Sequence, residues 1–128
     1  METILIVDDD KNFLDSVVEG LTDLTTFQYI SAENGKAALD VLSEQPVSLV
    51  VTDLKMPDKG GFELVAYLGR HFPSIPIIVM TAYGTPEMEQ NLQILGVRAY
   101  IEKPIDIDAL GNTIRDILTE SGASTSGW

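Results

Sequence analysis

Residues 4–10 read ILIVDDD, four branched apolar residues followed directly by three aspartates. A short apolar run that ends in polar residues is typical of a buried β-strand. Three adjacent carboxylates repel one another, so their position at the end of such a strand requires an explanation. They could form a solvated turn before a helix, where acidic side chains are favoured. Alternatively, they could belong to a site that needs negative charge, which the other strand ends can test.

The composition limits the classes of protein to consider. The chain has 128 residues, which fits one domain with a substantial core, and no apolar run approaches the roughly 20 residues needed to cross a bilayer. Without a signal-peptide pattern, we expect a cytoplasmic protein that does not contact a membrane. The absence of cysteine excludes disulfides and thiolate metal sites, so a metal must be held by oxygen ligands. A formal net charge of −12 disfavours direct binding to nucleic acid, which depends on Lys and Arg.

Apolar runs alternate with segments at helical spacing along the whole chain. The expected strands are Ile4–Val7, Gln28–Ala32, Val47–Thr52, Ile77–Met80 and Ala99–Ile101. A helix is expected after each strand, with Asp10, Asn34 and Asp106 as N-caps and Pro86 opening a short fourth helix through Leu92. The apolar residues that mark these helices include Phe13, Leu14, Val17, Leu21, Leu24, Ala38, Leu42, Phe62, Val65, Leu68, Leu110, Ile114 and Ile117. Five strand–helix repeats predict an α/β fold, a three-layer sandwich around a parallel sheet.

Four of the five expected strands end in residues that can perform chemistry. These ends carry Asp8 and Asp9, Asp53, Thr81, and Glu102 with Lys103, whereas the second strand ends in Ser31–Glu33 and contributes nothing. Ligands of open α/β sheets bind outside the carboxyl ends of the strands, where the strand order reverses. In the order 2-1-3-4-5, Asp53 lies between the acidic pair and Thr81. The sequence therefore predicts one central site.

The types of residue at this site indicate its chemistry. Converging carboxylates need a counter-charge, and an all-oxygen site favours Mg²⁺, or Mn²⁺, as the cation. Lys103 adds further positive charge. A carboxylate beside a metal, an ammonium and a hydroxyl is suited to phosphoryl transfer onto aspartate. We predict that Asp53 is the nucleophile and that Thr81 donates a hydrogen bond to the phosphoryl group.

Over residues 2 to about 119, the chain resembles the receiver domain of response regulators, the CheY-like proteins of two-component phosphorelay systems. The matched motifs are Asp8-Asp9, Asp53 with Met56-Pro57 and Gly60-Gly61, Thr81-Ala82, Tyr100 and Lys103-Pro104. The resemblance implies a flavodoxin-like sheet and a signalling domain that is not an enzyme but assists its own phosphorylation and dephosphorylation. The phosphoryl donor would be a phosphohistidine on a sensor histidine kinase or on a histidine phosphotransfer protein.

The resemblance also implies the roles of single residues. Mg²⁺ would be bound by Asp9, Asp53 and the backbone carbonyl of Lys55, with Asp8 acting through water. The Lys103–Pro104 bond would be cis. After phosphorylation, Thr81 would move to the phosphoryl group and the ring of Tyr100 would turn inward. This would change a surface made by the fourth helix, fifth strand and fifth helix, which an output domain or downstream protein would recognise.

Lys55 and Tyr83 stand two residues after the acceptor and after the switch Thr, where side chains of the family shape water access. We expect them to slow self-dephosphorylation, so small residues there should shorten the phosphoprotein lifetime; the alternative is that neither contacts the site.

The family's transcription factors dimerise through pairs of basic and acidic residues on the surface made by the fourth helix, fifth strand and fifth helix. Here PEMEQNLQ has no Lys or Arg and the fifth helix has only Arg115, which weakens the expectation of such a homodimer. Residues 120–128 are expected to form a flexible linker or tail, which could lead to an absent output domain.

Three other interpretations remain open at this point. An aspartate-nucleophile phosphatase of the haloacid dehalogenase type also has an Asp-x-Asp motif after its first strand, but it prefers Thr or Val where Asn12 stands. A flavodoxin-like flavin binder would share the sheet order, but acids in its first loop would repel the flavin phosphate. A degenerate receiver would act only as an interaction module, although every matched acceptor-site residue is present.

Overall fold

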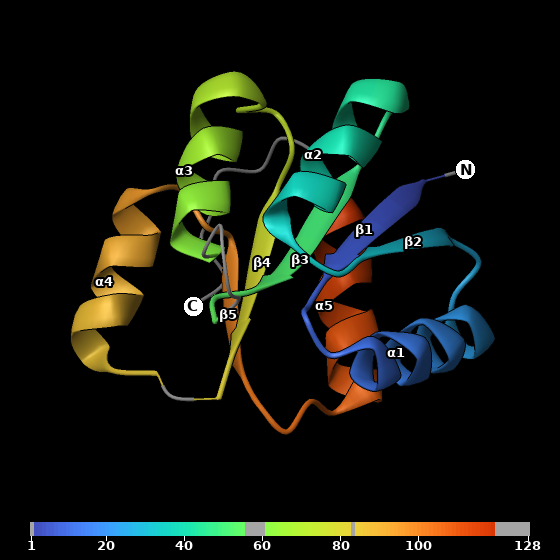
Figure 1. Cartoon of the computed structure of the whole chain (residues 1–128). Coiled ribbons are helices and arrows are strands. Elements are labelled where there is room, and N and C mark those ends of the chain that lie inside the picture. Colours follow the sequence, from blue (N-terminus) through green and yellow to red (C-terminus); the bar gives the residue numbers. More distant parts are fainter. Residues whose placement is uncertain (1, 56–60, 83, 120–128) are drawn as a thin grey trace.

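The computed structural model describes residues 2–55, 61–82 and 84–119 (Figure 1). Strands and helices alternate through these residues, as the sequence predicts. The elements are β1 (Thr3–Val7), α1 (Lys11–Leu24), β2 (Gln28–Ala32), α2 (Gly35–Glu44), β3 (Leu49–Asp53), α3 (Gly61–His71), β4 (Ile77–Thr81), α4 (Pro86–Ile94), β5 (Ala99–Glu102) and α5 (Ile107–Thr119). Met56, Pro57, Gly60, Tyr83 and the tail at 120–128, all named above, lie outside the described residues.

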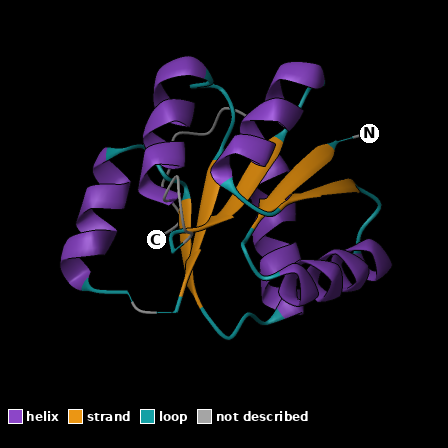
Figure 2. Cartoon of the chain, viewed as in Figure 1, coloured by secondary structure: helices purple, strands orange, loops and turns teal. Residues whose placement is uncertain are grey.

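The predicted three-layer α/β sandwich is confirmed. The strands pair in parallel in the order β2-β1-β3-β4-β5. Helices α1 and α5 cover one face of the sheet, and α2, α3 and α4 cover the other (Figures 1 and 2). In the part of the chain that is described, no helix is both long and apolar enough to span a membrane.

The core consists of two apolar clusters, one on each face of the sheet. Successive side chains of a strand point to opposite faces, so Leu5 and Val7 of β1 join the cluster under α2, α3 and α4. Ile4 and Ile6 join the cluster under α1 and α5. β1, β3 and β4 are buried along their whole length, which explains why their sequences are apolar without alternation.

The predicted helix starts agree with the structure. The side chain of Asp10 accepts the N–H of Phe13 at 3.1 Å, and that of Asn34 accepts the N–H of Ala37 at 2.8 Å. Asp106 accepts the N–H of Ala109 in the same way, at 3.2 Å. These bonds satisfy donors that have no partner inside the first turn of a helix. Of the three aspartates that follow β1, Asp10 is thus the cap of α1.

Some predicted bounds and apolar faces differ from the structure. β3 begins at Leu49, two residues later than predicted, and α4 ends at Ile94, two residues later than predicted. Phe62 and Leu24 are 37% and 44% exposed rather than core residues. Phe62 lies in the first turn of α3 and Leu24 in the last turn of α1, where the apolar stripe has run off the buried face. In α3, Leu64 is buried together with the predicted Val65 and Leu68.

Candidate functional site

The pairing of the strands assembles the candidate site. β1 lies beside β3, and β3 beside β4, all in parallel, so Asp8, which follows β1, is near Asp53, the last residue of β3. Thr81 ends β4, and its carbonyl accepts the backbone N–H of Lys103 at 2.8 Å. The sheet thus brings together residues that are up to 95 positions apart in the chain.

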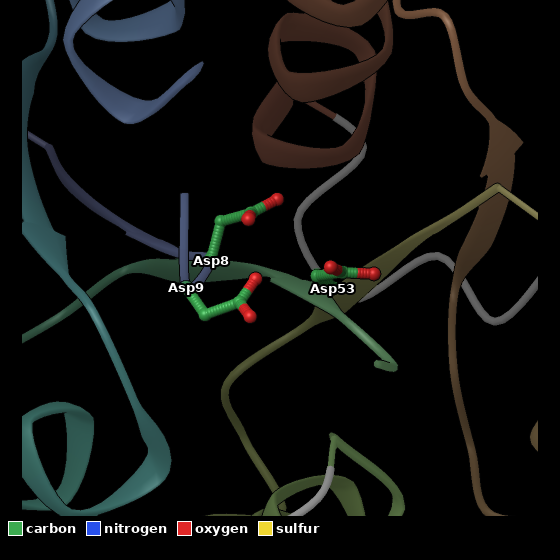
Figure 3. Close-up of side chains that lie close together, drawn as sticks. All are labelled: Asp8, Asp9 and Asp53. Atoms are coloured by element: carbon green, nitrogen blue, oxygen red, sulfur yellow. The ribbon is translucent and has the colours of Figure 1, made fainter. Parts of the chain in front are cut away.

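Asp8, Asp9 and Asp53 form a compact carboxylate cluster. One oxygen of each lies within 4.8 Å of the others, and the side chains of Asp8 and Asp9 extend toward the end of β3 that carries Asp53 (Figure 3). Asp8 and Asp53 are buried, with 0% and 5% of their surface exposed, whereas Asp9 is exposed. The cluster is therefore set into the protein but open on the side of Asp9.

Lys103 supplies positive charge to the two buried carboxylates. Its Nζ lies 2.7 Å from Oδ2 of Asp8 and 3.3 Å from Oδ2 of Asp53, and it donates a hydrogen bond to each. The same nitrogen lies 4.4 Å from the centre of the Phe13 ring, in the first turn of α1. The peptide bond between Lys103 and Pro104 is cis.

Backbone donors orient the other carboxylate oxygens. Oδ1 of Asp8 accepts the N–H of Asp10 at 2.9 Å, and Oδ1 of Asp53 accepts the N–H of Lys55 at 3.2 Å. Each buried carboxylate therefore has one oxygen bonded to the backbone and one bonded to Lys103. This arrangement satisfies the rule that buried polar groups are hydrogen-bonded.

The site's electrostatics are dominated by burial and by unequal numbers of charges. Burial raises the pKa of Asp53, with a smaller increase from Asp8, and this outweighs the lowering effects of the Lys55 N–H and Lys103. Burial alone would lower the pKa of Lys103, but its bonds and its attraction to Asp8 and Asp53 raise it overall. The two shifts thus have different main causes, burial for Asp53 and the neighbouring carboxylates for Lys103. The three carboxylates of the cluster therefore carry more negative charge than Lys103 can neutralise.

The donor set fits a hard divalent cation. Carboxylate oxygens are the ligands of Mg²⁺ and Mn²⁺, and the spacing of the three oxygens allows them to share one ion. The pKa of Asp53 is raised in the protein without a cation, so a positive ion would relieve the repulsion among the acids. The magnesium prediction is thus consistent with the geometry of the cluster.

Gly61 shows why the matched Gly60-Gly61 motif includes a glycine at its second position. A Cβ on Gly61 would collide with the carbonyl of Asp53 and with the backbone of Leu54. The N–H of Gly61 also donates to the carbonyl of Leu54 at 3.0 Å. Any larger residue would push α3 away from the strand end that carries Asp53. The sequence contained this signal, but only the structure gives its physical reason.

Tyr100 lies in β5, away from the carboxylates, and packs against the cluster under α2, α3 and α4. Its hydroxyl occupies the place that a Cβ of Gly84 would take, in the connection from β4 to α4. Burial, Glu102 and Glu89 together raise the pKa of the hydroxyl. The Tyr100 side chain therefore brings β5 into contact with the segment that follows Thr81.

Three further residues complete the comparison with the sequence prediction. Lys55 follows β3 with an exposed side chain, and Tyr83 lies outside the described residues. Phe13 was assigned only to the apolar face of α1, and its contact with Lys103 was missed. The available signal was its position one turn after the acidic cap, at the first apolar site of the helix.

Comparison with known proteins gives a consistent result. The sequence matches the family described as "Response regulator receiver domain" over residues 4–115. The "Transcriptional regulatory protein GlrR" of Escherichia coli (strain K12) is 36% identical over 123 residues, which are 95% of this chain but 27% of that protein. "Sporulation initiation phosphotransferase F" of Bacillus subtilis (strain 168) is 32% identical, with coverage of 91% of this chain and 94% of that protein.

A solved structure agrees with these sequences. The response regulator receiver domain protein (CheY-like) from Methanospirillum hungatei JF-1 superposes with a TM-score of 0.88 and 30% identity, over 94% of this chain and 96% of that one. The chain thus matches some relatives over nearly their whole length, and spans about a quarter of others such as GlrR.

Proposed function

Because the chain belongs to the response regulator receiver domain family, whose members act in phosphorelay signalling, we propose that Asp53 is its phosphoryl acceptor. The observation that carries the proposal is the surrounding of this carboxylate. It is 5% exposed, lies 3.3 Å from the ammonium of Lys103 and shares a cluster with Asp8 and Asp9. Asp8 shares these features, since it is 0% exposed and lies 2.7 Å from the same ammonium, but Asp53 ends the central strand β3, between Asp8 after β1 and Thr81 at the end of β4.

In the proposed reaction, a carboxylate oxygen of Asp53 attacks the phosphorus of a phosphohistidine on a histidine kinase or a histidine phosphotransfer protein. The new oxygen–phosphorus bond forms as the phosphorus–nitrogen bond breaks, and the imidazole nitrogen keeps the electron pair. The ammonium of Lys103 neutralises charge on the phosphoryl oxygens, and the hydroxyl of Thr81 donates a hydrogen bond to them. Water would then hydrolyse the acyl phosphate and restore the Asp53 carboxylate. The same side chains would thus assist both the phosphorylation and the dephosphorylation of the domain.

The proposed cation is Mg²⁺, with Mn²⁺ as a substitute. Asp9 and Asp53 would bind it together with the backbone carbonyl of Lys55, while Asp8 would reach it through water. When bound, the cation neutralises charge that develops on the transferring phosphoryl group. Two of these acids are buried and one is exposed, which supports entry of the cation from the side of Asp9.

The test is intact-mass measurement after incubation with Mg²⁺ and a small-molecule phosphodonor. The wild type should gain the mass of one phosphoryl group, and Asp53→Ala should gain none. Asp23→Ala, which removes an exposed carboxylate from α1, is the matched control and should gain the same mass as the wild type. No gain in the wild type, or an equal gain in Asp53→Ala, contradicts the assignment. Steady turnover of a phosphate ester would favour a phosphatase.

The proposed response passes from Thr81 to Tyr100 and changes the surface made by α4, β5 and α5. The contact of the Tyr100 hydroxyl with Gly84 supports this route, because Gly84 is three residues after Thr81. An output domain or a downstream protein would read the change. Its relatives include a transcriptional regulatory protein and a phosphotransferase, so several outputs are compatible with this domain.

Three lesser assignments belong to the same proposal. Residues 1–119 would form the receiver domain and 120–128 a linker or tail, in a protein of the cytoplasm. The exposed side chain of Lys55, two residues after Asp53, would slow dephosphorylation together with Tyr83. A homodimer through α4, β5 and α5 would need contacts other than basic residues of α4, since Pro86–Ile94 contains no Lys or Arg.

A further inference from the structure

The ammonium of Lys103 has an aromatic neighbour in addition to its two carboxylates. Its Nζ lies 4.4 Å from the centre of the Phe13 ring. A cation within about 6 Å of a ring centroid is attracted by the ring's negative face. Phe13 is half-buried and packs against the cluster under α1 and α5, so its ring is held by the core rather than free in solvent.

We propose that Phe13 is a positioning residue for phosphoryl transfer, whose ring keeps the Lys103 ammonium above the pair formed by Asp8 and Asp53. The inference rests on the function proposed above, in which Lys103 neutralises the phosphoryl oxygens. A lysine carries a compact charge on a flexible four-carbon stem, so its position depends on the groups around it. Phe13 is one of those groups, and it comes from a different element than the acids.

The reaction itself explains why an aromatic contact is needed. Phosphorylation converts the Asp53 carboxylate into an acyl phosphate, and Asp8 is shared with the proposed cation. The contact of Lys103 with Asp53 therefore changes as the reaction proceeds, and its contact with Asp8 changes when the cation binds. The ring of Phe13 carries no charge and takes no part in the chemistry, so its attraction for the ammonium persists before and after transfer.

The acidic residues that precede α1 also help to position the Phe13 ring. The side chain of Asp10 accepts the N–H of Phe13 at 3.1 Å, which sets the first turn of the helix. Asp8 accepts the N–H of Asp10 at 2.9 Å, so the residue that pairs with Lys103 is tied to the cap. The position of Phe13 is therefore coupled through the backbone to the carboxylate cluster.

The decisive variants separate the ring face from its apolar bulk. Phe13→Leu keeps an apolar side chain but removes the π face, and Phe13→Tyr keeps the face. Phe27→Leu is the matched control, because Phe27 is also half-buried against the same cluster. Phe27 directly precedes β2, whose first residue pairs with the start of β1, so it lies at the opposite end of the strands from the carboxylates. The rate constant for phosphorylation by a small-molecule donor at saturating Mg²⁺ should fall about fivefold in Phe13→Leu, the change expected for a partly desolvated cation–π contact. It should stay within about twofold of the wild type in the other two variants.

A second readout reports the contact without phosphorylation. In NMR spectra of the metal-free protein, the ring current of Phe13 should shift the ε-methylene protons of Lys103 upfield. The shift should vanish in Phe13→Leu and remain in Phe13→Tyr and Phe27→Leu. An unshifted signal in the wild type, equal slowing in Phe27→Leu, or no recovery in Phe13→Tyr overturns the inference.

The two proposals fail in different ways. A wild type that gains no phosphoryl group overturns the function proposed for Asp53, and with it the role of Phe13. Normal phosphorylation that is unaffected by Phe13→Leu overturns only the role of Phe13.

Discussion

The strands that carry the acids and the elements around Tyr100 belong to one sheet but are built in opposite ways. β1 and β3 are buried at every position, whereas each residue of β5 is at least partly exposed. α4, next to β5 along the chain, buries only Leu92, and its Ile94 is 83% exposed. Segments with few buried contacts open most readily in folded proteins. The acid cluster is thus set at the ends of fully buried strands, whereas β5 and α4 of the proposed switch are only partly buried.

This difference suits the two tasks. Phosphoryl transfer requires side chains held in position before the reaction, so the acceptor benefits from a rigid base. A switch requires two arrangements of similar free energy, which a fully packed region cannot provide. The predictions below test whether the two regions differ as their burial indicates.

The largest expected effect is on packing below the acids. Leu5→Ala, at a fully buried position of β1, should lower the free energy of unfolding by about 3 kcal/mol, the usual cost of a large cavity in a core. Ile94→Ala should change it by less than about 0.5 kcal/mol, because the side chain in α4 is mostly exposed. Urea unfolding measures both. Similar losses in the two variants would contradict the contrast.

The second prediction concerns the charge that stabilises the acid cluster. Lys103→Met leaves the buried Asp8 without its 2.7 Å partner and should cost about 2 kcal/mol in EDTA, less than a fully buried pair because Lys103 is 21% exposed. Lys11→Met is the control, since its 3.8 Å pair with Asp15 is exposed and should contribute less than about 0.5 kcal/mol. Mg²⁺ should restore more stability to Lys103→Met than to the wild type. Equal Mg²⁺ effects on the two melting temperatures would argue against a shared role of ammonium and cation.

The third prediction follows from the raised pKa of Asp53. A carboxyl whose pKa is raised by folding contributes stability below its unfolded value of 3.8, and this contribution is lost as the pH rises through the folded pKa. Above the folded pKa, the ionised carboxyl of Asp53 therefore weakens the metal-free protein. Asp53→Asn should stabilise it by about 1 kcal/mol in EDTA, the scale of a typical single substitution.

The pH and the cation provide the controls for this variant. The gain in Asp53→Asn should shrink as the pH is lowered to below 3.8, where the wild-type carboxyl is protonated in both states. Mg²⁺ should stabilise the wild type more than the variant. Asp23→Asn, at an exposed position of α1, should show neither behaviour. A gain that is constant from pH 4 to pH 7 would mean that ionisation is not its cause.

The acid cluster could be predicted from sequence because its geometry follows from topology. Parallel strands end at one edge, so the residue types at the ends of β1, β3 and β4 were sufficient to place Asp8, Asp53 and Thr81 together. The predicted strand order needed no knowledge of side-chain packing. Helix caps were predictable for a similar reason, since Asp10 acts on the backbone of its own helix.

The contacts that sequence analysis missed all depend on packing between elements. The ring of Phe13 meets Lys103 from a different helix, and Gly61 is required because α3 approaches the carbonyl of Asp53. In both cases the residue type alone allows a simpler explanation, an apolar helix face or a turn. Phe62, one of the apolar residues that marked the third helix, is exposed, which the sequence did not predict because a helical repeat specifies spacing but not which of two adjacent stripes is buried.

The smallest expected effect is at the contact between Tyr100 and Gly84. Gly84→Ala places a methyl group where the Tyr100 hydroxyl lies, and the half-buried ring should turn outward at a cost of about 1 kcal/mol or less, below the usual cost of overpacking a core. Because burial is the main cause of the raised Tyr100 pKa, that pKa should fall toward 10.0, which NMR titration of the ring can follow. Gly69→Ala is the control: its methyl group would find only the Leu95 carbonyl, at 3.5 Å, so this α3 substitution should be neutral or stabilising. If Tyr100 keeps its raised pKa in Gly84→Ala, its ring has a second buried position. The contact with Gly84 would then constrain the ring less than the structure indicates.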